Sequence, residues 1–218
     1  MADLLVELLS EEIPAGMQKN AAKQLELLLV EKIKELGLEY LSVGTYYASR
    51  RLVVFINGLP IIQSDRTIER KGPRVSSSDS AIKGFLNSNG ISLDDCELRD
   101  DKKGKYYVAV FEEEGRPVKD LLASVIQNAI LKLNWPKSMR WANFQFRWVR
   151  PLQNILVVFD GVSVSGSIKA DNWEQLFTNY TYGHRFLAPE KIFIESHEDY
   201  VKKLANKFVI IDPDKRMN

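Results

Sequence analysis

The sequence predicts an α+β fold, in which antiparallel or mixed sheets pack against helices. Segments of strand type outnumber segments with helical spacing, and they often follow one another directly instead of alternating with helices. Long segments with apolar residues at helical spacing supply amphipathic helices that can cover a sheet. At 218 residues, the chain can bury the core of one large domain or of two small ones.

The amino-terminal part is predicted to form a strand, a helix and a hairpin. A near-alternating pattern predicts the first strand, which ends at Pro14, and Gly37 is a suitable C-cap for the helix that follows. Two further strands meet around Ser49–Arg50, which predicts a hairpin turn there. In order, the elements are strand 3–14, helix 18–36, strand 42–48 and strand 51–58.

The middle of the chain is predicted to contain shorter, more strongly charged elements. Ser78 or Asp79 can cap a short helix that Gly90 closes, and the turn at 101–104 favours a hairpin. In order, we expect a strand and a basic loop within 61–73, a helix over 80–90, and strands over 96–100 and 105–115.

The last part is predicted to add helices and strands. A hairpin turns at Asp160–Gly161. Near the end, Asp212 is a good N-cap and Pro213 a favoured first helical residue, so a helix is expected to begin there and to be truncated by the chain end. In order, the other elements are helix 118–133, strands 153–161, 162–170 and 191–196, and helix 197–207.

The glycine and proline at Gly115–Pro117 indicate a domain boundary. We expect an N-terminal α+β region over 1–115, a second α+β region over 116–212, and the start of a truncated helix over 213–218. A single domain stays open as the alternative.

The composition excludes several classes of protein. The net charge is +1, so the molecule is no general binder of polyanions, and any such role must depend on local charge. A single cysteine excludes an internal disulfide framework, and two histidines make a zinc site built by this chain improbable. The chain starts without a signal peptide and has no apolar run long enough to span a membrane, so we expect a cytoplasmic protein.

Motifs of catalysis are missing from the sequence. It contains no GxxxxGKS/T, GxGxxG, HExxH or GxSxG pattern. His184 has no acid or thiol partner nearby in the sequence, and a lone histidine more often packs or forms a hydrogen bond. A free-standing enzyme is therefore the least favoured class.

Local clusters of positive charge are more informative. Residues 45–75 contain six cations and two acids, whereas residues 76–114 contain five cations and nine acids. The segment 134–151, "NWPKSMRWANFQFRWVRP", has four cations and five aromatic residues and no acid. Arginines bind phosphates and exposed aromatic rings stack on unpaired bases, so these segments could form an RNA surface if the fold brings them together.

The aromatic residues in that segment have a second interpretation as core. If "FQFRWVRP" is a strand, alternation sends Phe144, Phe146 and Trp148 to one face and Gln145, Arg147 and Val149 to the other; the first face is expected to be mostly buried and Arg147 exposed.

Five blocks of sequence resemble the β-subunit of bacterial glycyl-tRNA synthetase. In chain order they are "DLLVELLSEEIPAGM", "SRRLVVFINGLP" with "DRTIERKGP", "NWPKSMRW", "FRWVRPL" and "YGHRF" with a following proline. Together they span nearly the whole chain in the order of the family.

The resemblance implies an α2β2 tetramer that ligates glycine to tRNA(Gly) with ATP and magnesium. In the family the catalytic core lies on the α subunit, so ATP and Mg²⁺ are expected there, and this chain is expected to hold neither cofactor, metal nor catalytic residue. The β subunit mainly supplies tRNA recognition and contacts to α, and is much longer than this chain. We therefore expect a non-catalytic part of a β subunit, with the α subunit and tRNA(Gly) as partners and no membrane.

The candidate RNA-binding residues are the cations of these basic segments. Their expected role is to hold phosphates and orient the tRNA toward the partner's active site. A purely structural or assembly role, in which the cations pair with acids and contact no RNA, stays open. The candidates are Arg50, Arg51, Arg70, Lys71, Arg74, Lys137, Arg140, Arg147, Arg150, His184 and Arg185.

Overall fold

A computed structural model describes residues 1–170 and 172–217, and it confirms the α+β class. The chain forms two compact units, of which the first comprises Met1–Gln63 with Arg116–Asn218 and the second comprises Ser64–Gly115. The expected regions 1–115 and 116–212 do not coincide with these units, because strands from both regions pair within one sheet of the first unit.

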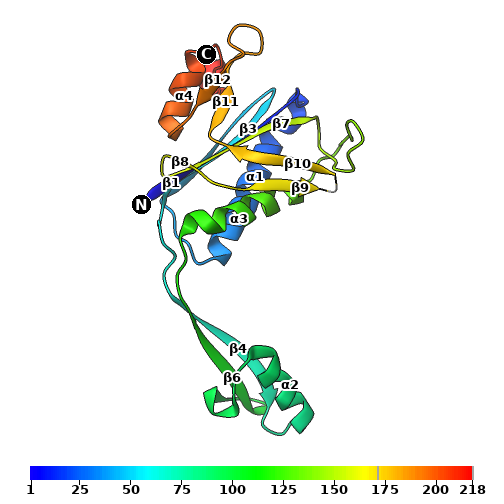
Figure 1. Cartoon of the computed structure of the whole chain (residues 1–218), viewed down its shortest axis with the longest axis vertical. Helices are drawn as coiled ribbons and strands as arrows, with labels where there is room; N and C mark the ends of the chain where they lie inside the picture. Colours follow the sequence, from blue (N-terminus) through cyan, green and yellow to red (C-terminus); the bar gives the residue numbers. More distant parts are fainter. Residues whose placement is uncertain (171, 218) are drawn as a thin grey trace. The chain divides into compact units, whose positions relative to one another are not determined.

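A seven-stranded mixed sheet forms the centre of the first unit, with the order β2-β3-β1-β7-β10-β9 and β8 paired to β7 (Figure 1). The central strand β1 is antiparallel to both β3 and β7, and β10 joins β7 in parallel. The predicted hairpin at Ser49–Arg50 is confirmed, since Ala48 pairs with Arg51. The strands are β1 (Ala2–Ser10), β2 (Ser42–Ala48), β3 (Arg51–Leu59), β7 (Leu152–Phe159), β8 (Val162–Ser163), β9 (Ser167–Ala170) and β10 (Trp173–Thr178).

Two helices cover one face of this sheet. The predicted helices are confirmed as α1 (Ala15–Glu35) and α3 (Val118–Lys132), which pack on each other and on the sheet. Alternate residues of β1, namely Leu4, Val6 and Leu8, point to this face and are fully buried in the main apolar core. The apolar stripe of each helix and this face of the sheet thus exclude water together.

The opposite face of the sheet is covered by α4 (His197–Ala205) and the two-stranded sheet of β11 (Tyr180–Tyr182) and β12 (Lys191–Phe193). Leu5 of β1 and Tyr200 of α4 belong to this second core. Glu7 lies in β1 two residues after Leu5, so its carboxylate points into the same apolar layer. Strands β10 and β11 were not among the elements predicted from the sequence.

The second unit is a three-stranded antiparallel sheet with one helix (Figure 1). Ser78 caps the helix, as predicted, because its hydroxyl accepts from the N–H of Ala81, and Gly90 closes it in the left-handed conformation. The elements are β4 (Arg66–Arg74), α2 (Asp79–Asn89), the short 3₁₀ turn η1 (Leu93–Asp95), β5 (Cys96–Asp101) and β6 (Gly104–Glu113), and the strand order is β4-β6-β5.

Two predictions about later segments have different outcomes. Residues 144–151 do not form the strand that the alternating pattern allowed. They belong to a loop in which Trp148 forms an isolated β-bridge with Met139. A helix does begin at Pro213, as α5 (Pro213–Met217). No helix in the described part of the chain is long and apolar enough to cross a membrane.

Candidate functional site

The aromatic residues of the 134–151 segment belong to the core. Trp148 is 1% exposed and packs edge-on against Trp135 at a ring distance of 5.1 Å. Phe146 stacks on Trp173 with ring centroids 4.9 Å apart, and Trp141 meets the same Trp173 edge-on. The prediction that these aromatic residues are mostly buried is confirmed. The rings pack against one another and do not form an exposed surface on which bases could stack.

The cations of the same segment point outward. Lys137, Arg140 and Arg147 are exposed, and we call these three residues the basic rim. The Met139–Trp148 bridge fixes the backbone of the loop, and Arg147 donates to both the hydroxyl and the carbonyl of Ser138 at 3.1 Å. Within the described ranges no carboxylate lies within ion-pair distance of the rim.

Strict alternation is wrong for this segment, although Arg147 is exposed as expected. Val149 is buried beside Trp148, because the loop turns at a bridge instead of extending as a pleated strand. Arg150 is half-buried and donates to the carbonyl of Val149 at 2.8 Å.

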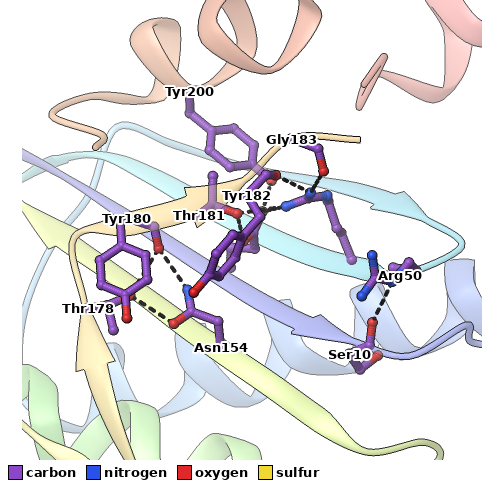
Figure 2. A network of polar contacts seen from close by, with 11 residues as sticks. Ser10, Arg50, Asn154, Thr178, Tyr180, Thr181, Tyr182, Gly183 and Tyr200 are labelled. Atoms are coloured by element: carbon purple, nitrogen blue, oxygen red, sulfur yellow. Dashed lines mark hydrogen bonds and ion pairs between the residues drawn. The ribbon is translucent and has the colours of Figure 1, made fainter. Parts of the chain in front are cut away.

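Arg51 occupies a different environment from the other candidates. Its side chain is 4% exposed, and its Nη1 donates to Glu7 Oε2 and to Thr181 Oγ1, each at 2.7 Å. Thr181 and Tyr200 both donate to the same carboxylate, so three elements converge on β1 (Figure 2). This buried pair removes Arg51 from the candidate RNA-contacting residues.

The buried network shifts the pKa values of its members. Burial acts to lower the pKa of Arg51, but the Glu7 carboxylate and Tyr200 act in the opposite direction and the net shift is upward. Burial, and then the Glu7 carboxylate, raise the pKa of Tyr200 well above its usual value. Arg51 therefore keeps its positive charge, and Tyr200 keeps the hydroxyl proton that it donates to Glu7.

A sequence signal for this pair exists. Glu7 alternates with Leu5 and Leu9 on one face of β1, and Arg51 alternates with Val53 and Phe55 on β3. A charged residue on an apolar, buried face requires a partner of opposite charge. An acid and an arginine in such positions on two strands therefore predict an ion pair between them.

Arg51 also fixes the turn that follows β11. Its Nη2 donates to the carbonyls of Tyr182 and Gly183, as Figure 2 shows, and Asn154 binds the carbonyl of Tyr180 at 2.7 Å. The "SRR" and "YGHRF" blocks, far apart in the sequence, are therefore joined by direct hydrogen bonds. Both blocks contact Glu7 of β1 through Arg51 and Thr181 or lie directly beside these residues.

Gly183 is required by the close packing of this turn. A Cβ atom at this position would lie 2.6 Å from the backbone oxygen of Ala188, which cannot move aside as a flexible side chain could. We expect Gly183→Ala to lower the free energy of unfolding by about 1–3 kcal/mol, measured by urea denaturation. Gly16→Ala is the control, because a Cβ there has no neighbour within 4 Å; an equal effect of both changes would contradict the packing.

Arg50, which is half-buried, and Arg185, which is exposed, lie beside the turn. Arg50 donates to the carbonyl of Ser10 at 3.2 Å (Figure 2) and approaches Glu11 Oε1 at 3.7 Å. Arg185 lies 3.3 Å from Glu11 Oε2 and 3.8 Å from Glu12. His184 serves the turn itself, since its Nδ1 accepts from the backbone N–H groups of residues 186 and 187.

The remaining candidates belong to the second unit. Lys71 and Arg74 pair with Asp101 at 3.0 and 3.3 Å, and Lys71 lies over the ring of Tyr106. Arg70 is exposed and donates to the side chain of Asn89. Apart from Arg51, Arg150 and His184, the candidates thus form three groups: the basic rim, the pair Arg50 and Arg185 beside the 182–183 turn, and the cations of the second unit.

No group of three or more His, Cys, Asp or Glu side chains that could hold a metal ion occurs among residues 1–170 and 172–217. The exposed guanidinium and ammonium groups of the candidate residues are suited to bind anionic groups.

Comparison with a family model and with curated proteins points to one family. A family model described as "Glycyl-tRNA synthetase beta subunit" matches residues 4–218. Proteins named "Glycine--tRNA ligase beta subunit" are 42% identical in Cereibacter sphaeroides, 41% in Paracoccus denitrificans and 39% in Rhodospirillum centenum. Each alignment covers 99% of this chain but 31%, 32% and 33% of the relative, so the chain spans about a third of the length of the curated relatives it matches.

Proposed function

Since the chain belongs to the glycyl-tRNA synthetase β-subunit family, we propose that it supports the ATP-dependent ligation of glycine to tRNA(Gly) by positioning the tRNA. The observation that carries this proposal is the basic rim, where three exposed cations form no ion pair with any carboxylate of residues 1–170 and 172–217, on a loop whose aromatic residues anchor it against the core. The bond-forming steps, with their ATP and Mg²⁺, belong in this proposal to a partner α subunit in an α2β2 tetramer of the cytoplasm.

The physical role of the rim is electrostatic. Phosphate contacts fix the register and orientation of a nucleic acid without reading its sequence, and exposed guanidinium and ammonium groups can make such contacts. The anchored backbone lowers the entropy that ordering this loop on binding would cost. The tRNA would thereby reach the partner's active site in one orientation.

The affinity of the complete tetramer for tRNA(Gly) tests the rim. We expect the triple variant Lys137→Ala, Arg140→Ala and Arg147→Ala to bind roughly tenfold or more weakly at low salt, measured by fluorescence anisotropy, because three phosphate contacts are lost. A matched control removes three exposed lysines elsewhere in the first unit: Lys19, Lys34 and Lys202. If the two triple variants bind equally well, the rim has no special role.

A contribution to subunit assembly is the second candidate function. Phe186 and Leu187 are 79% and 63% exposed, in the loop between β11 and β12. Exposed apolar groups of this size in a turn held by Arg51 are suited to an interface with the α subunit. We expect Phe186→Ser with Leu187→Ser to reduce co-elution with α in gel filtration while tRNA affinity of any assembled tetramer is retained; unchanged assembly would exclude this loop from the interface.

A further inference from the structure

Two adjoining cavities lie beside the turn that Arg51 holds. They have volumes of about 460 and about 300 Å³ and share Arg50, Gly183 and Arg185 as lining residues. The larger one also reaches Phe208 and Arg216. Its volume lies in the range of pockets that bind small organic ligands, which is roughly 300–1,000 Å³.

Where the cavities meet, two guanidinium groups already hold an anion. The carboxylate of Glu11 lies between them, at 3.7 Å from Arg50 and 3.3 Å from Arg185. Arg185 is 40% exposed in its side chain, so its ion pairs are weak and exchangeable. A phosphate, which accepts two parallel hydrogen bonds from a guanidinium and carries more charge, would compete well for this place.

Three arginines and two partly exposed carboxylates meet around Arg50. Burial lowers the pKa of Arg50 and the charges of Arg185 and Arg51 add to this shift, whereas Glu11 and Glu12 oppose it. Glu7 is paired with Arg51, so Glu11 and Glu12 are the carboxylates that stabilise Arg50 and Arg185. A phosphate that displaces Glu11 would take over its stabilisation of these two guanidinium groups.

Phe208 supplies the second, independent observation. Its φ is 61°, a left-handed conformation that costs a side chain of this size free energy, and its ring is 62% exposed and lines the larger cavity. Glycine would fit this position after α4 better, and packing in the core gives the ring no compensation. An exposed aromatic ring beside arginines is the arrangement that binds an unpaired base.

We propose that these cavities bind one nucleotide, whose phosphate replaces Glu11 between Arg50 and Arg185 and whose base stacks on Phe208. The nucleotide is either free or an unpaired residue of RNA. These residues are distinct from the basic rim, so the site and the proposed function can fail separately.

The free nucleotide is tested by calorimetric titration of the 218-residue chain with adenosine 5′-monophosphate (AMP) and with inorganic phosphate. We expect Glu11→Gln to bind both probes at least about threefold more tightly, because the competing carboxylate is gone. Phe208→Gly is expected to weaken AMP binding by roughly tenfold, to leave phosphate binding unchanged, and to keep or raise Tm. The control Phe186→Ala should change neither affinity.

The RNA source is tested with tRNA(Gly). If AMP does not bind but Phe208→Gly weakens tRNA binding without changing its salt dependence, the site is for an unpaired RNA nucleotide. Absence of binding by AMP together with wild-type tRNA affinity in Phe208→Gly would overturn the proposal. If the wild type does bind AMP, a Glu11→Gln variant that binds it no more tightly would overturn the proposal as well. The triple rim variant should keep its AMP affinity, which separates this test from that of the rim.

Discussion

Replacing Arg51 with methionine is expected to lower the free energy of unfolding by about 3–5 kcal/mol, because the change leaves the carboxylate of Glu7 buried without its cation. Glu7 is fully buried, and after the substitution only the hydroxyls of Thr181 and Tyr200 would still donate to it among its present partners. The carbonyls of the 182–183 turn would lose their donor as well. Since whole domains are stable by about 5–15 kcal/mol, the loss is measurable by urea denaturation with circular dichroism.

The neighbouring arginine supplies the control for this prediction. Arg50→Met removes the same chemical group one residue earlier, but Arg50 is half-buried and its ion pair with Glu11 is longer, at 3.7 Å, and partly exposed, so a smaller cost of about 1 kcal/mol is expected. The double variant Glu7→Leu with Arg51→Met should lose less than the sum of its single changes, because no unpaired charge is left. Equal effects of Arg51→Met and Arg50→Met would contradict the buried pair.

Trp148→Ala is expected to lower the free energy of unfolding by about 3–5 kcal/mol, since it empties a space in the core that no neighbour can fill. Trp148 is in contact with both Trp135 and Phe146, so its loss also loosens the anchor of the basic rim. Thermal or urea denaturation of the 218-residue chain measures this effect.

Arg147 is the matched control for Trp148, because it is the preceding residue and points outward. Arg147→Ala should change stability by less than about 0.5 kcal/mol, as is usual for surface positions. A stability loss for Arg147→Ala as large as that for Trp148→Ala would mean that the cations of this loop, and not its aromatic rings, hold it in place.

Local signals made much of the fold predictable. The hairpin at Ser49–Arg50, the helix capped by Ser78 and the helix start at Pro213 all follow from interactions between residues close in the sequence. The two long helices follow from a regular apolar spacing that only a helix can bury on one side.

Interactions between distant residues could not be predicted in the same way. The pairing of β1 with β7, about 150 residues later, leaves no trace in either strand alone, and it is the reason why the second unit is an insertion between two parts of the first. In the loop containing Trp148, apolar and polar residues alternate as in a strand, but within the described residues the loop pairs with no strand along its length and is joined to Met139 by an isolated bridge. Adjacent arginines differ for the same reason: strand pairing turns Arg51 toward Glu7 and leaves Arg50 in the turn.

The candidate site was therefore partly predictable. The segments rich in cations were evident from composition, whereas the pairing of Arg50 and Arg185 with Glu11 depends on contacts between distant parts of the chain. The apolar-face argument for Glu7 and Arg51 uses sequence alone and would have separated these two from the rest.

The salt dependence of tRNA(Gly) binding tests the central claim, that the basic rim contacts phosphates, most directly. In a plot of the logarithm of the association constant against that of the salt concentration, the rim triple variant should have a slope smaller in magnitude by about 2–3 than the wild type, since each lost phosphate contact contributes about 0.7–0.9. The Lys19, Lys34 and Lys202 control should keep the wild-type slope. A rim variant with the wild-type slope and affinity would contradict the account.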